Sequence, residues 1–286
     1  MPGNLAAAPP RPAFRRRREV GAASARSLLL TVLGELVLPS GLPVWTSSLL
    51  AALALLGVEE KAARQALART AAEGWVAPRR RGRRTAWELT EAGRQLLTEG
   101  AARIYGFGAP AAGWDGRWLL LLVSAPDAGR QLRHQLRTRL EWGGLGTLAP
   151  GVWVGAHPER QAEVVATLTD LGLAGAATCF VARMGGLGDP GRVARQAWNL
   201  AEIELRYEEF LEAVRPIRPS GPAATLVAQV RLVQEWRRFP FLDPGLPAEL
   251  LPDPWSGTRA AALFRARHAR WKPLADRHWR QLSLAG

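Results

Sequence analysis

Arginine is concentrated in one short stretch of this sequence. The run RRRGRR at residues 79–84 lies between two short segments, 75–78 and 85–89, that have the aromatic residues typical of β-strands. Five guanidinium groups at this density repel one another, and a nearby polyanion removes that cost. Guanidinium groups also bind phosphate oxygens and enter narrow minor grooves. The sequence therefore predicts a hairpin that contacts nucleic acid through Arg79, Arg80, Arg81, Arg83 and Arg84.

The segment before the hairpin has the periodicity of a helix from about residue 59 to 72, ended by Gly74. Small residues share its inner face: Ala62, Ala63, Ala66, Leu67 and Thr70. Lys61, Arg64, Gln65 and Ala68 share the outer face, which taken alone is that of any solvated helix. Arginine and glutamine have the forked geometry that suits guanine and adenine edges. We expect Lys61, Arg64 and Gln65 to contact bases and Arg69 to support phosphate contacts.

A helix followed by a basic hairpin is the core of a winged helix-turn-helix domain, which we place at residues 24–106. Ser24 should cap a first helix that Pro39 stops, and Thr46 or Ser47 should cap a second that Gly57 ends. A last helix closes the domain near Tyr105. Residues 1–23 are rich in proline, alanine and arginine, which predicts a disordered basic arm.

The remaining chain divides into two parts after a Gly/Ala/Pro linker. Residues 114–186 follow the order β-α-β-β-α-β of a ferredoxin-like domain. Residues 190–286 show only helical patterns, including one long helix over 192–217, and form a helical C-terminal domain. The predicted fold class is α+β.

The charge of the chain favours a polyanionic partner. The 286 residues carry a net charge of +13, with 16 Arg and Lys against 8 Asp and Glu in residues 1–110. Residues 111–286 are closer to balance, with 22 against 17. Nucleic acid is the expected partner, ahead of an acidic membrane or a small anion.

No catalytic or metal-binding pattern is present. The single cysteine, Cys179, excludes an internal disulfide and lies in an apolar run where a small buried side chain is expected. The glycine-rich stretches lack phosphate-loop spacing. Four histidines are dispersed and expected on the surface or in loops: His134, His157, His268 and His278. We expect no metal, no cofactor and no enzymatic activity.

The apolar runs are shorter than the roughly 20 residues that a membrane helix needs. The stretch RRRREVGAASARSLLLTVLGELV has the basic start and apolar centre of a signal peptide, but Glu35 interrupts that centre. The same residues make a good amphipathic helix. We therefore expect a cytoplasmic protein with no membrane partner.

Nearly the whole chain resembles the PaaX-type regulators, repressors of phenylacetate-degradation operons. The similar stretches are SLLLTVLGELVLPSG, EKAARQALARTAAEGWV, LTEAGRQLL, WDGRWLLLLVSAP, LGTLAPGVWVGAHP, AWNLAEIELRYEEF and RRFPFLDPGLPAELLPDPW. The resemblance implies an N-terminal winged-helix domain, a central domain similar to the CRISPR-associated protein Cas2, and a helical C-terminal domain. It also implies a homodimer on a double-stranded DNA operator, released by an aromatic acyl-CoA such as phenylacetyl-CoA.

Such an effector would need an apolar slot lined by aromatic rings, with arginines for the phosphates of CoA. Ordinary core packing explains the same aromatic residues equally well. The candidates are Trp118, Trp153, Arg183, Trp198, Tyr207, Arg237 and Arg238.

The resemblance to Cas2 raises a metal-dependent nuclease as an alternative. Such nucleases hold a metal through an acidic residue at the end of the first strand. Here that strand ends at Val123 and Ser124, Asp127 follows only as the next helix begins, and Asp115 lies at the other end. A nonspecific nucleic-acid-binding scaffold is the other alternative. The sequence favours a DNA-binding repressor over both.

Overall fold

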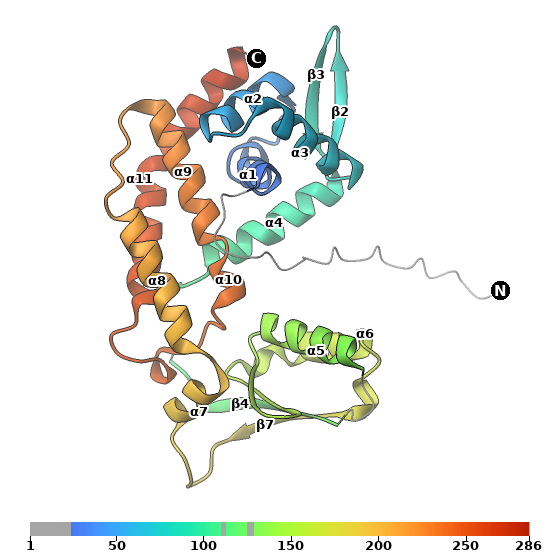
Figure 1. The fold of residues 1–286 in the computed structure, drawn as a ribbon, viewed down its shortest axis with the longest axis vertical. Helices are drawn as coiled ribbons and strands as arrows, with labels where there is room; N and C mark the ends of the chain where they lie inside the picture. The colour runs from blue at the N-terminus through green and yellow to red at the C-terminus, as the bar shows by residue number, and fades with distance from the viewer. Residues whose placement is uncertain (1–23, 110–112, 125–128, 286) are drawn as a thin grey trace, which may run out of the picture.

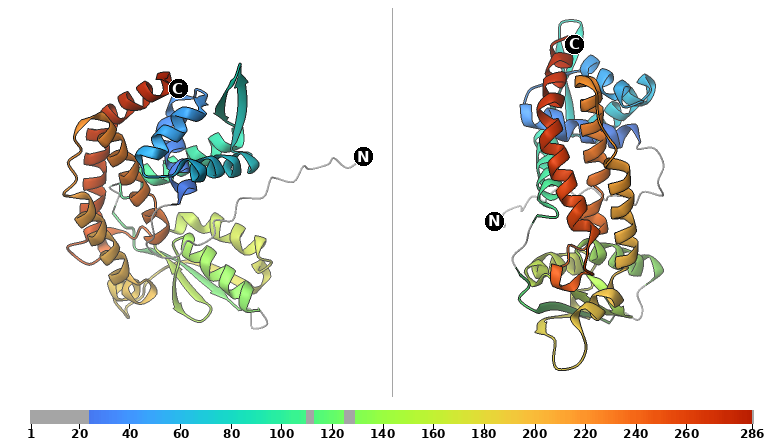
Figure 2. Two further views of the ribbon diagram at one scale, coloured as in Figure 1. Left: turned by 45° about the horizontal axis from the view of Figure 1, so that its top comes forward. Right: turned by 90° about the vertical axis from the view of Figure 1, so that its left-hand side faces the viewer.

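The computed structural model describes residues 24–109, 113–124 and 129–285; the predicted basic arm, residues 1–23, lies outside this part. Long helices of the C-terminal part form a spine, drawn in orange and red in Figure 1. An N-terminal unit, residues 24–106, and a central domain built on a sheet both project from the same side of this spine (Figure 1 and Figure 2). In the described part of the chain, no helix combines the length and apolarity needed to cross a membrane.

The N-terminal unit contains four α-helices and a small sheet. Its elements are α1 (Ala25–Val32), a π-helical turn (Leu33–Val37), a 3-10 turn (Leu38–Ser40), β1 (Val44–Trp45), α2 (Thr46–Leu55), α3 (Glu60–Ala72), β2 (Val76–Arg81), β3 (Arg84–Leu89) and α4 (Glu91–Gly106). The strands pair antiparallel in the order β1-β3-β2.

Two predicted helix starts have different outcomes. The Ser24 side chain accepts a hydrogen bond from the Ser27 amide at 3.2 Å, as expected of a cap on α1. The prediction that Thr46 or Ser47 caps α2 is wrong, because α2 begins at Thr46 and Trp45 occupies the cap position. The Thr46 hydroxyl instead donates to the Thr85 carbonyl at 2.9 Å, which joins α2 to the sheet.

The central domain has the predicted order of elements. They are β4 (Arg117–Val123), α5 (Arg130–Trp142), β5 (Gly146–Ala149), β6 (Val152–Gly155), α6 (Gln161–Asp170) and β7 (Ala177–Arg183). The antiparallel sheet has the order β5-β6-β4-β7, in which the first strand lies between the third and the fourth. Leu119 and Leu121 of β4 pack against Leu136 and Leu140 of α5 and Leu168 of α6, so both helices cover one face.

The C-terminal part is helical, as predicted. It consists of α7 (Pro190–Ala197), α8 (Leu200–Val214), α9 (Gly221–Trp236), α10 (Phe239–Leu242) and α11 (Ser256–Ala285). The prediction of a single helix over residues 192–217 is wrong, because two helices, α7 and α8, occupy this range. The chain is extended at Trp198, whose ring enters the core, and Asn199 restarts the helix by accepting a hydrogen bond from the Glu202 amide at 3.2 Å.

The core of the N-terminal unit includes residues from the C-terminal helices. Leu226 and Val230 of α9 and Trp279 of α11 are buried together with Leu29 and Leu49 of the first two helices. Because each helix buries its apolar face in this shared core, the N-terminal unit and the spine are held as one packed body.

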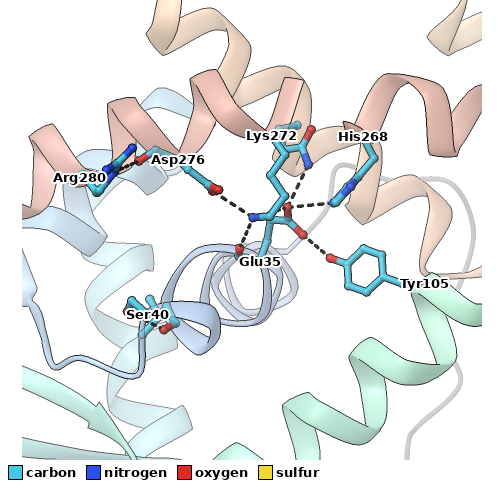
Figure 3. A network of polar contacts seen from close by, with 9 residues as sticks. Glu35, Ser40, Tyr105, His268, Lys272, Asp276 and Arg280 are labelled. Atoms are coloured by element: carbon cyan, nitrogen blue, oxygen red, sulfur yellow. Dashed lines mark hydrogen bonds and ion pairs between the residues drawn. The ribbon is translucent and has the colours of Figure 1, made fainter. Parts of the chain in front are cut away.

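A buried carboxylate lies at the centre of this junction (Figure 3). The Glu35 side chain, on the π-helical turn, is 2% exposed. It accepts hydrogen bonds from the Tyr105 hydroxyl of α4 and from Nε2 of Gln229 of α9 at 2.9 Å. From α11, Nε2 of His268 lies 3.0 Å and Nζ of Lys272 lies 3.4 Å from its Oε1. The prediction that His268 lies on the surface or in a loop is therefore wrong.

Two opposing effects set the pKa of Glu35. Burial raises the pKa, because it penalises the charged form, but the contacts with His268, Lys272 and Tyr105 outweigh it. The pKa falls from its ordinary value of 4.5 to about 2. The carboxylate is thus ionised in the folded protein and stabilises the fold at neutral pH.

We expect Glu35→Gln to destabilise the protein at pH 7 by roughly 3 kcal/mol, because Lys272 and His268 lose a buried partner. A folded-state pKa below the unfolded value gives stability that is present above pH 4.5 and is lost as the pH falls towards 2. The gap in unfolding free energy between wild type and variant should therefore narrow over that range. Urea denaturation at several pH values measures it, with the exposed Glu163→Gln as control. A gap that stays constant with pH would contradict the assignment.

Candidate nucleic-acid interface

The arginine-rich run forms a longer hairpin than the sequence predicted. The pairing of β2 with β3 extends from Val76 opposite Leu89 to Arg81 opposite Arg84, so only Gly82 and Arg83 form the turn. Gly82 has a φ of 63°, as the first position of a type II′ turn requires. Because the ladder continues to the turn, the arginines are carried on a rigid projection of the sheet.

The base of the hairpin is anchored to the start of α2. The indole Nε1 of Trp87 donates to the Thr46 hydroxyl at 2.9 Å, and this hydroxyl donates to the Thr85 carbonyl at 2.9 Å. Strand β1 pairs with β3 through Val44 and Trp45. These contacts fix the direction in which the hairpin leaves the domain.

The five arginines of the hairpin have different surroundings. Arg79 pairs with Glu88 across the strands, with Nε 2.5 Å from Oε2, and this contact raises the pKa of Arg79. The guanidinium of Arg84 lies over the Trp45 ring, 4.3 Å from its centroid. The other three are exposed and have no ion pair among the described residues: Arg80, Arg81 and Arg83. Unneutralised positive charge is therefore concentrated at the tip.

Helix α3 divides its residues as the sequence predicted. Ala63, Ala66, Leu67 and Thr70 are buried, and Ala62 is half-buried. Lys61, Arg64, Gln65, Ala68 and Arg69 are exposed on the outer side. Arg64 is not free, because its Nη2 lies 2.7 Å from Oε1 of Glu60 one turn earlier. The outer face of α3 therefore exposes four polar side chains around the small side chain of Ala68.

One joint links the end of α3 to the hairpin and to α4. The Thr90 hydroxyl donates to the Gly74 carbonyl at 2.5 Å, and the Thr90 amide donates to the Trp75 carbonyl at 3.1 Å. Arg26 of α1 pairs with Glu73 and lies over the Trp75 ring. In Figure 1 the hairpin and α3 lie on the side of the N-terminal unit away from α11. The two predicted contact elements are therefore joined within one packed unit.

Comparison with known proteins shows similarity over nearly all of the described chain. Residues 24–93 match the family described as PaaX-like protein, residues 111–194 its central Cas2-like domain, and residues 198–281 its C-terminal domain. Transcriptional repressor PaaX of Escherichia coli (strain K12) is 33% identical over 263 residues, which cover 88% of this chain and 82% of that protein. The chain belongs to the PaaX family of transcriptional regulators.

A solved structure has a similar fold. Uncharacterized protein Rv0674 from Mycobacterium tuberculosis superposes with a TM-score of 0.63 at 22% identity. The match covers 89% of this chain and 98% of that one. The arrangement of the three parts is thus shared with that protein.

The structure separates the aromatic residues that the PaaX resemblance suggested for an effector. Trp118, Trp198 and Tyr207 lie in the core between the central sheet and the C-terminal helices, whereas Trp153 lies in the core under α5 and α6. The Tyr207 hydroxyl donates to Oδ2 of Asp243 at 2.6 Å. The indole N–H groups of Trp118 and Trp198 are buried and have no acceptor among the described residues. Trp118 lies on β4 and Trp198 directly follows α7.

The three candidate effector arginines are also apart. Arg183 is exposed at the end of β7, opposite Arg117. Arg237 donates from Nη1 to the Ser27 carbonyl at 3.3 Å and to the Thr31 hydroxyl at 2.9 Å, which ties α9 to α1. Arg238 lies over the Phe239 ring and has Nη1 3.3 Å from Oε2 of Glu235. Two hollows of about 620 and 80 Å³ on the central domain include none of the seven candidates in their lining.

The central domain gives no further support to a nuclease site. Asp127, the first carboxylate after β4, lies outside the described residues. The Arg117 amide donates to Oδ1 of Asp115, and the Arg117 guanidinium lies 2.5 Å from Oδ2; both contacts lower the pKa of Asp115. Cys179, expected to be buried, is only half-buried at the edge strand. Within the described ranges, no three acidic, histidine or cysteine side chains gather as metal ligands.

Gly93 of α4 packs directly against the backbone of Trp75, where the end of α3, the hairpin and α4 meet. A Cβ added at Gly93 would lie 2.0 Å from the Trp75 carbonyl oxygen, which accepts the Thr90 hydrogen bond. Gly93→Ala should therefore destabilise the protein by about 2–3 kcal/mol, because backbone must move. Gly100→Ala in the same helix meets no atom within 4 Å and should stabilise it by up to about 1 kcal/mol. Thermal denaturation of both variants checks this, and equal stability of the two would refute the packing argument.

Proposed function

We propose that the protein is a homodimeric, DNA-binding transcriptional repressor whose N-terminal unit is a winged helix-turn-helix. One observation carries the proposal: the exposed polar face of α3 and the unpaired arginines of the hairpin tip belong to one packed unit, joined through Thr90, Gly74 and Trp75. The order α1-β1-α2-α3-β2-β3, with the sheet order β1-β3-β2, supports it. The E. coli relative is named a transcriptional repressor.

In this proposal α3 enters the major groove. Lys61, Arg64 and Gln65 contact base edges, and Arg69 contacts a phosphate. Arg64 exchanges Glu60 for a guanine edge, and because both are exposed the exchange costs little. The hairpin lies over the adjacent backbone or minor groove, with Arg80, Arg81 and Arg83 on phosphates and Arg79 and Arg84 at its sides. A homodimer presents two such units to the half-sites of a partly palindromic operator.

The proposal includes release of DNA by an aromatic acyl-CoA such as phenylacetyl-CoA, in control of aromatic-acid catabolism. Family membership supports this part. The buried indole N–H groups of Trp118 and Trp198 have no acceptor among the described residues, and each is a donor available to a thioester carbonyl. Arg183, at the end of the strand that pairs with the strand of Trp118, is exposed and supplies a charge for phosphates.

The combined change of Arg80, Arg81 and Arg83 to alanine should weaken binding to every duplex. Each lost phosphate contact removes about 0.9 from the slope of log K against log salt, and a dimer loses up to six contacts, so the slope should fall by about 5. Arg64→Ala should instead lower the ratio of operator to nonspecific affinity, by roughly 1–3 kcal/mol if its contact is bidentate.

Gel shifts on a duplex selected from the organism's own promoter DNA, and on a scrambled duplex, measure both effects. The matched control changes three exposed arginines elsewhere to alanine: Arg192, Arg231 and Arg270. The assigned surface would be refuted if the salt dependence of log K fell only in the control variant. It would also be refuted if the salt dependence fell in neither the hairpin variant nor the control. A selected duplex that binds no better than the scrambled one would favour a nonspecific scaffold.

Phenylacetyl-CoA should weaken operator binding by about 5- to 150-fold, the usual range of coupling between two sites. CoA alone and phenylacetate alone should not, because each lacks half of the recognised groups. Trp198→Phe keeps an aromatic ring but removes the donor, and should reduce the response while leaving DNA affinity intact. Fluorescence anisotropy titrations with and without phenylacetyl-CoA measure this loss of operator affinity. If phenylacetyl-CoA weakened operator binding of the Trp198→Phe variant as much as that of wild type, the Trp198 indole N–H would be excluded as a contact.

A further inference from the structure

Helix α5 of the central domain carries a second group of unpaired arginines. Its sequence, RQLRHQLRTRLEW, contains four arginines and one glutamate. Arg139 reaches Asp170 of α6, with the nearest atoms 3.5 Å apart. Arg130, Arg133 and Arg137 are exposed and have no hydrogen bond or ion pair among the described residues. The exposed charge of this domain is therefore concentrated on one helix.

The three arginines lie on one flank of α5. The buried residues Leu136 and Leu140 fix which side of the helix faces the sheet. At 3.6 residues per turn, Arg130, Arg133 and Arg137 fall within about 60° of one another around the helix axis. They span about 10 Å along it, at 1.5 Å per residue. We call these three residues the α5 stripe.

The α5 stripe is unfavourable in the isolated protein. Arg130 and Arg133 are three residues apart and Arg133 and Arg137 four, the spacings at which like charges on a helix repel. Arg130 is also the first residue of α5, where the helix dipole disfavours a cation, and no acidic side chain lies in that turn. Bound anions would remove both costs.

The layer of α5 and α6 faces the side of the molecule that holds the N-terminal unit. All three views place these helices between the central sheet and the N-terminal unit (Figure 1 and Figure 2). The two parts project from the same side of the spine, so α3, the hairpin and α5 all lie on that side of the molecule.

We propose that the α5 stripe is a second contact surface for the DNA backbone. This inference rests on the proposed function. It extends that function by adding a contact to the DNA backbone that does not depend on the operator sequence. Each strand carries one negative charge per about 3.4 Å along the duplex axis, so a span of about 10 Å corresponds to three phosphates. Backbone contacts made by the central domain would lengthen the footprint and strengthen binding to all sequences equally.

The test measures binding of the full chain to a mixed-sequence duplex by fluorescence anisotropy, from about 50 to 200 mM salt. The variant changes Arg130, Arg133 and Arg137 together to alanine. Because a bound dimer loses up to six phosphate contacts, its slope of log K against log salt should fall by about 5 relative to wild type. Lysine at all three positions keeps the point charges and should restore the slope. Glutamine at all three replaces alanine if the alanine variant unfolds at a lower temperature.

The control is again the combined alanine variant of Arg192, Arg231 and Arg270, which removes the same charge from α7, α9 and α11. A slope equal in the α5 variant and this control overturns the inference, because the stripe would then act only through net charge. That result leaves the proposed function intact if the hairpin variant still loses affinity. A wild-type protein that binds no duplex overturns both.

Discussion

The ionised Glu35 is the interaction on which the arrangement of this protein depends. A carboxylate that is 2% exposed is tolerated only with its partners in place, and these come from α4, α9 and α11. The π-helical turn that carries Glu35 follows α1, which packs against α3. The position of the C-terminal helices and that of the exposed α3 face are therefore linked through one charge and the apolar core around it.

In contrast to the buried and fully paired Glu35, some surface arginines have no acidic partner among the described residues. Several described arginines outside the two proposed contact surfaces have acidic partners: Arg26 pairs with Glu73, Arg206 with Glu202 and Glu209, and Arg259 with Glu208. The hairpin tip and the α5 stripe lack such partners in the described chain. Leaving charges unpaired at neighbouring positions costs stability through repulsion, and this cost falls only when a polyanion is bound. Both surfaces belong to parts of the protein that project from the same side of the spine (Figure 1).

Features set by neighbouring residues could be predicted from the sequence. The cap at Ser24, the inner and outer faces of α3, the order of elements in the central domain and the basic hairpin all follow from local spacing. The partners of Glu35 could not, because they lie 70 to 237 residues away along the chain. In the sequence Glu35 only interrupted an apolar run. The break at Trp198 has a similar origin, since the burial of its ring against the central domain outweighs the helical periodicity on both sides. Among the candidate effector residues, Arg237 was suggested for phosphates, yet its hydrogen bonds go to α1.

The contacts of α9 give a physical reason why the proposed ligand would affect the proposed DNA-contact surface of the N-terminal unit. Arg237 and Gln234 of α9 both hydrogen-bond to α1, through Ser27 and Thr31. Leu226 and Val230 of α9 share the core that buries the inner side of α3. A closely packed interior does not deform gradually, so a shift of α9 must either break these hydrogen bonds or carry α1 with it. Because α3 and the hairpin are fixed to α1 through Arg26, Glu73 and Trp75, a displaced α1 changes the orientation of both contact elements together.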